Sequence, residues 1–138
     1  MSARTAILTV ADDLLTSIGG KQTLQGIYVG DISIPTTPAV ITQMVFYFII
    51  ECSVDDIFKS ITLEITFPGE APKQIPVSFA TPIIPAGRSK HIIRATAMIQ
   101  FPILRPGRID AKVIHEKGEI IVAAPWITQI SAQGNSPA

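Results

Sequence analysis

The placement of proline constrains this chain more than any other feature of its sequence. The 138 residues include 11 prolines, and most of them stand between short apolar runs. Proline lacks the backbone N–H that a helix interior or a central strand requires, so each proline ends or interrupts an element. A chain divided in this way has room for strands of ordinary length but not for long helices.

The abundance of residues that branch at Cβ also favours strands over helices. Isoleucine occurs 24 times and leucine only 6 times, and isoleucine, valine and threonine together account for 44 residues. Branching at Cβ restricts χ1 and suits a pleated, half-buried strand better than a helix. We therefore expect an all-β fold.

Alternation of apolar and polar residues locates the clearest strands. From Ile61 to Phe67, apolar residues alternate with threonine and glutamate, which is typical of a strand with one solvated face. Residues 90–101 show the same period, with Phe101 expected on the apolar face. Pro76 places residues 75–79 at a sheet edge. The other expected strands cover residues 5–11, 23–34, 40–52, 108–113, 119–124 and 126–130.

Seven to nine short strands with turns between them predict a two-sheet antiparallel β-sandwich, with a β-barrel as the alternative architecture. We expect residues 1–130 to form a single domain and residues 131–138 to form a flexible C-terminal tail. Residues 12–21 are expected to be a connection that turns at Gly19-Gly20. A hairpin turn is expected at residues 115–118.

The charge balance argues against several classes of partner. The chain has 11 basic and 11 acidic residues, and only 16% of its residues are charged. No excess of charge favours nucleic acid or a membrane surface as a partner. The longest uncharged stretch, Ile32–Ile50, contains Pro35 and Pro38 and does not predict a membrane-spanning helix. A lone cysteine without an export signal predicts a cytoplasmic protein, and no cofactor motif is present.

Two stretches of the chain resemble a family of small uncharacterised bacterial proteins. The first is Gly20–Tyr28 (GKQTLQGIY), followed by Ile32, Pro35 and a long apolar strand. The second comprises Phe101-Pro102, Pro106-Gly107-Arg108-Ile109, a turn ending at Gly118 and a strand after Pro125. Together they cover about half of the chain. The resemblance implies a β-sandwich without an assigned activity, and it carries over no functional residue.

The sequence assembles no catalytic set. Gly19-Gly20-Lys21 lacks the earlier glycine and the following serine or threonine of a phosphate-binding loop. Cys52 is either a small core residue or a nucleophile that would need His91 or His115 as its base. Because no spacing brings these residues together, we expect a non-enzymatic protein, with an unrecognised hydrolase-like activity as the alternative.

Loop residues support an alternative function as a binding module. Asp12-Asp13 and Asp55-Asp56 either cap turns or, if their loops meet at one end of the sandwich, supply carboxylates to calcium. Trp126 either packs against the body or stacks on a sugar. The alternative is therefore a module that binds a small ligand, metal or carbohydrate through its end loops.

The run from Met44 to Ile50 (MVFYFII) is apolar on both faces of its expected strand. No helix is expected to cover an antiparallel sandwich, so the outer face of this strand needs another cover. We predict a homo-oligomeric protein-interaction or structural module, with another protein as a further partner. A cover from the chain's own loops and a ligand groove are the alternatives. The candidate interface residues are Met44, Phe46, Phe48 and Ile50.

Charge is also segregated along the chain. Residues 1–87 carry 4 basic and 8 acidic side chains, whereas residues 88–117 carry 7 basic and 2 acidic ones. The basic segment is expected to pair within the molecule, with another subunit, or with an anionic partner.

Overall fold

The computed structural model describes residues 3–130, and these residues form strands and turns without a helix. None of the described residues therefore belongs to a helix that could cross a membrane. The strands are β1 (Thr5–Ala11), β2 (Asp13–Thr16), β3 (Gln22–Gln25), β4 (Ile32–Ile34), β5 (Ala39–Val40), β6 (Gln43–Ser53), β7 (Ile61–Thr66), β8 (Lys73–Val77), β9 (Lys90–Gln100), β10 (Ile103–Leu104), β11 (Gly107–Arg108), β12 (Asp110–His115), β13 (Gly118–Val122) and β14 (Trp126–Gln129).

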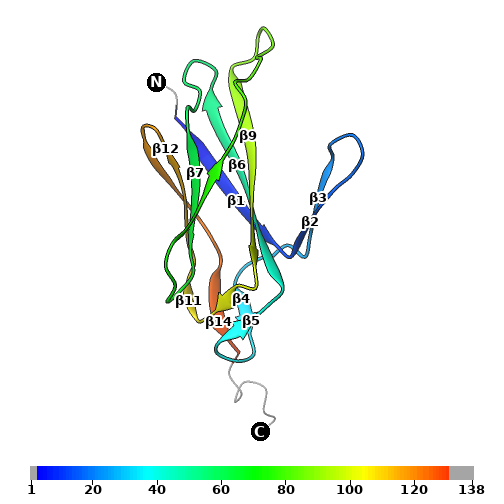
Figure 1. The fold of residues 1–138 in the computed structure, drawn as a ribbon, viewed down its shortest axis with the longest axis vertical. Helices are drawn as coiled ribbons and strands as arrows, with labels where there is room; N and C mark the ends of the chain where they lie inside the picture. The colour runs from blue at the N-terminus through cyan, green and yellow to red at the C-terminus, as the bar shows by residue number, and fades with distance from the viewer. Residues whose placement is uncertain (1–2, 131–138) are drawn as a thin grey trace.

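Two antiparallel sheets form the body (Figure 1). One sheet has the order β1-β6-β9 and the other has the order β13-β12-β7-β8. Inward-facing residues of both sheets share one hydrophobic core, where the Phe46 ring meets the Phe67 ring edge-on at 5.8 Å between centroids. The predicted all-β, sandwich-like fold is confirmed, and no sheet among the described residues closes into a barrel.

Three smaller sheets raise the number of strands above the predicted seven to nine. The two-stranded sheet β10-β5 and the three-stranded sheet β11-β14-β4 extend one end of the body, and β2-β3 forms a separate hairpin. Within these sheets β14 and β4 run parallel. Hydrophobic alternation does not report the direction of a partner strand, so the sequence pattern could not reveal this pairing.

The long strands lie close to their predicted positions. Strand β1 has the predicted bounds, β7 ends one residue early, and β8 with Pro76 lies at a sheet edge as expected. The segment predicted as a strand over residues 23–34 divides into β3 and β4, because Gly26 and Gly30 adopt positive φ angles between them. The predicted tail, 131–138, lies outside the described residues.

Two predictions about local structure were wrong. Residues 12–21 are not a simple connection, since they contain β2 and the turn of the β2-β3 hairpin. Phe101 does not lie on the buried face of β9. Its φ of 50° is left-handed, which ends the alternation of the strand and leaves Phe101 65% exposed.

Candidate interaction surface

A hairpin projects from the body, and most of its residues are exposed. We call this hairpin, residues 13–25, the arm; Figure 1 shows it in blue, leaning away from β6 and β9. Its register sets Leu14 opposite Leu24 and Leu15 opposite Thr23. Gly19 and Gly20 both have positive φ angles at the tip, and the Ser17 N–H donates to the Lys21 carbonyl at 2.8 Å. The arm is thus a regular two-stranded ribbon.

The base of the arm is fixed to the body by hydrogen bonds. The Asp12 N–H donates to the Gln25 carbonyl at 2.9 Å, and the Tyr28 hydroxyl donates to an Asp12 carboxylate oxygen at 2.7 Å. Gln43 Nε2 of β6 donates to the Asp12 carbonyl and to Asp13 Oδ1. Burial, followed by the hydrogen bond to Asp12, raises the pKa of Tyr28 to about 12, so its hydroxyl keeps the proton that it donates.

One face of the arm turns toward the outer face of the β1-β6-β9 sheet. Gln22 and Leu24 share this face, because alternate residues of a strand point the same way. Gln22 Oε1 accepts a hydrogen bond of 2.9 Å from the Tyr47 hydroxyl of β6. Leu24 is partly buried, whereas Leu15 on the opposite face of the arm is exposed. The arm therefore supplies part of the cover over β6.

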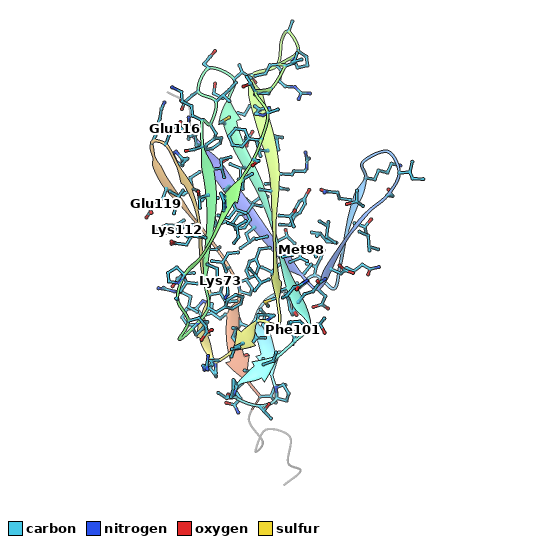
Figure 2. The ribbon with its side chains drawn as sticks, viewed as in Figure 1. Lys73, Met98, Phe101, Lys112, Glu116 and Glu119 are labelled. Atoms are coloured by element: carbon cyan, nitrogen blue, oxygen red, sulfur yellow. The ribbon has the colours of Figure 1, made fainter. Side chains whose placement is uncertain are left out.

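That cover is incomplete. Val45 is fully buried and Tyr47 is 9% exposed, but other apolar side chains on the same face are exposed or only half-buried. The register places Ile7 opposite Ile49 and Met98 opposite Val45, and Figure 2 shows Met98 on the side of β9 from which the arm projects. We call this group the outer surface; its members are Ile7, Ile49, Ile92 and Met98.

Exposure of the arm and of the outer surface is large for apolar groups. Ile18 at the tip of the arm is fully exposed, Ile7 is 62% exposed and Met98 is 50% exposed. Leu15 and Ile92 are also exposed. Single exposed apolar residues are ordinary on proteins, whereas several on one face of a sheet are candidates for an interaction site.

The residues predicted for the interface lie elsewhere. Met44, Phe46, Phe48 and Ile50 are all fully buried in the core of one protomer. They point inward from β6, so they cannot form a surface, and the prediction placed the interface on the wrong face of the strand. The sequence could not decide between the faces because both are apolar. The outward-facing residues of β6 are Val45, Tyr47 and Ile49.

The opposite end of the body is held by a cluster around Arg4, which sequence analysis missed. The Arg4 side chain, 6% exposed, forms ion pairs with Glu116 at 2.7 Å and with Asp56 at 3.1 Å. Its Nη1 donates to His115 Nδ1 at 2.9 Å, and its guanidinium lies 4.3 Å from the centre of the Phe58 ring. This cluster joins β1, the β6-β7 loop and the β12-β13 hairpin.

Acidic and basic groups of the Arg4 cluster shift each other's pKa values. The hydrogen bond from Arg4 is the main cause that lowers the pKa of Glu116 to about 2. A hydrogen bond from Lys117 lowers the pKa of Asp56. Burial, with Arg4 nearby, lowers the pKa of His115, which fits a neutral imidazole whose Nδ1 accepts from Arg4.

The structure does not bring the two aspartate pairs together, as the alternative of a calcium site would require. Asp12-Asp13 follows β1, whose last residue pairs with Val45, whereas Asp55-Asp56 follows β6 beyond Ser53. The length of β6 therefore separates the pairs. Asp12 and Asp56 instead bind Tyr28 and Arg4, and the described residues contain no group of three or more metal-ligating side chains.

The register does bring Cys52 opposite His91 on neighbouring strands. Cys52 is fully buried, and burial is the main cause that raises the pKa of its thiol. A nucleophilic cysteine needs an accessible thiolate, so this geometry is that of a core thiol. His115 Nδ1 accepts a hydrogen bond from Arg4, and the His115 ring meets the Phe58 ring edge-on.

The basic segment is largely paired within the protomer. Of its seven basic side chains, five form ion pairs with carboxylates of the same chain. They are Lys90, Arg105, Arg108, Lys112 and Lys117. The segregation of charge along the sequence is therefore mostly neutralised in the fold.

No family model matches the chain, and neither a curated protein nor a solved structure matches it. The resemblance to a family of small bacterial β-sandwich proteins stays a prediction.

Proposed function

We propose that this chain is a non-enzymatic structural module that works by self-association, in which a second copy covers the arm and the outer surface. The arm carries the proposal, because it is a two-stranded hairpin outside the sandwich with Ile18 fully exposed at its tip. A two-stranded hairpin is marginally stable by itself in water. Packing against a second copy would stabilise it.

Charge favours a second copy as the occupant. The chain has no net charge, so long-range repulsion does not oppose association. The base of the arm is acidic at Asp12 and Asp13, whereas β9 carries Arg94 on its outward face. An arm laid across the outer surface of another copy would bring these opposite charges near each other.

An open strand edge supplies a second point of attachment. Strand β9 pairs with β6 on one side, and no backbone hydrogen bond within residues 3–130 reaches its other side. Unpaired edges are templates for a strand from another chain. A stable interface buries about 800 Å2 on each partner, which exceeds what one side chain supplies, so the arm and the outer surface must both take part.

Light scattering on the purified protein tests the proposal. At tens of micromolar we expect a mass of at least twice the 14.8 kDa of one chain. Ile18→Ser and Ile7→Ser should each shift the protein toward monomer, because each places a polar group in the interface. Their circular dichroism spectra should not change, since both side chains are exposed in one protomer.

Ile83→Ser is the matched control. Ile83 is 97% exposed in the loop between β8 and β9, outside the arm and the outer surface. It should leave the mass unchanged. A wild-type protein that scatters as a monomer, or an oligomer that survives both interface substitutions, would contradict self-association through this surface.

A further inference from the structure

A groove lies on the side of the sandwich away from the arm. It has a volume of about 730 Å3 and is lined by residues of β7, β12 and β13 and by the start of β14. Figure 2 shows Lys112 and Glu119, both lining residues, on the opposite side of the body from the arm. Ala123 and Ala124, which follow β13, contribute small side chains to the lining of the groove.

Trp126 contributes a large apolar side chain to the groove. Its backbone pairs with Arg108 of β11, which fixes its position, yet its side chain is 52% exposed. Ile121, which is 81% exposed, also lines the groove. An exposed indole held by a strand gives a flat apolar surface for a ligand without ordering a loop.

Strand register places the charged residues of the lining next to one another. Glu64, Lys112 and Ile121 lie opposite one another on β7, β12 and β13. Lys112 Nζ lies 3.2 Å from Glu64 and 3.1 Å from Glu119. Arg108 and Asp110, which also line the groove, form an ion pair at 2.8 Å. The lining therefore offers hydrogen-bond donors and acceptors as well as the indole.

The charges of the lining nearly cancel. Its ionised residues are two basic and three acidic, namely Arg108, Lys112, Glu64, Asp110 and Glu119. Such a surface does not favour an anion, since each cation already has a carboxylate partner. It suits a neutral ligand that combines an apolar face with many hydroxyl groups.

We propose that this groove binds a neutral saccharide, with a sugar ring stacked on Trp126 and its hydroxyls hydrogen-bonded to Glu64, Lys112 and Glu119. Proline-rich peptides also use exposed tryptophans, but they dock between several aromatic side chains. Trp126 is the single aromatic residue of this lining, which favours a sugar.

Trp126 is the only tryptophan of the chain, so its fluorescence reports on the groove directly. We expect one or more neutral hexasaccharides of glucose, xylose or N-acetylglucosamine to change the emission in a saturable way. A proline-rich peptide and an anionic uronic-acid oligosaccharide should not. No saturable change with any neutral saccharide, or a response to the peptide alone, would overturn the proposal.

Calorimetry on variants locates the site. Trp126→Ala and Ile121→Ser should each weaken binding, Trp126→Ala by about tenfold or more, which corresponds to the loss of one stacked ring. Phe101→Ala removes another exposed aromatic side chain, which lies outside the groove, and should leave the affinity unchanged. Unchanged affinity in Trp126→Ala, with a folded circular dichroism spectrum, would exclude this groove as the site.

Discussion

The sandwich body and the arm are built from similar residues, but only the body encloses them. Ile50 on β6 and Ile18 in the arm have the same side chain, and the first is fully buried while the second is fully exposed. The body has two sheets whose apolar faces meet, whereas the arm has one layer and only part of β6 behind it. The comparison shows that exposure here follows from the number of layers rather than from composition.

Substitution of the core should break the body completely. Phe46→Ala removes a fully buried ring that packs against Phe67, and large-to-small changes of this kind cost about 3–5 kcal/mol. We expect urea denaturation to show a correspondingly lower free energy of unfolding. A nearly unchanged urea midpoint would mean that the Phe46 side chain is exposed to solvent, which would contradict the fold.

The Arg4 cluster should be the next largest contribution. Arg4→Ala leaves Glu116 without its cation, and breaking a largely buried ion pair costs up to about 3 kcal/mol. Arg108→Ala is the control, because both partners of its ion pair with Asp110 are mostly exposed, and such pairs contribute at most about 1 kcal/mol. Equal losses of stability in the two variants would argue against a special role for Arg4.

The same cluster predicts how stability depends on pH. The pKa of Glu116 is about 2 in the fold, below its ordinary 4.5, so ionised Glu116 stabilises the fold. This contribution is complete above about pH 4.5 and is lost as the pH falls toward 2. Denaturation across this range should show a weaker pH dependence in Glu116→Gln than in the wild type; identical slopes would contradict the assignment.

A substitution at the base of the arm should cause a smaller loss of stability. Gly26 has a left-handed φ of 68°, and a Cβ atom there would collide with the Asp12 side chain, so Gly26→Ala should cost about 1–3 kcal/mol. Gly87→Ala, at a φ of 85° with open space around it, measures the backbone cost alone. Thermal denaturation should show the larger loss for Gly26→Ala, and equal losses would exclude the contact with Asp12.

Sequence analysis predicted the elements that carry their own periodicity. Ile61–Phe67 alternates strictly because β7 has one wet face and one buried face. The arm was not predicted, although Leu14-Leu15 and Thr23-Leu24 flank the Gly19-Gly20 turn in the manner of a hairpin. The aspartates and glycines around these short apolar pairs made the segment look like a connection.

Relationships between distant residues were beyond the reach of the pattern. Met44–Ile50 is apolar at nearly every position, so its inward face was determined only by packing. Arg4 meets Asp56 and His115 across 52 and 111 residues of sequence, and no local signal joins them. Trp126 was a candidate from its residue type, but the groove beside it depends on the register of β7, β12 and β13.

Hydrogen exchange of the backbone amides of residues 13–25, compared between dilute and concentrated protein, tests the central claim most directly. If a second copy covers the arm, these amides will be protected in concentrated protein and will exchange rapidly on dilution, while amides of β6 and β7 keep the same protection at both concentrations. Arm amides that exchange at the same rate at both concentrations would show that the arm has no partner of its own kind.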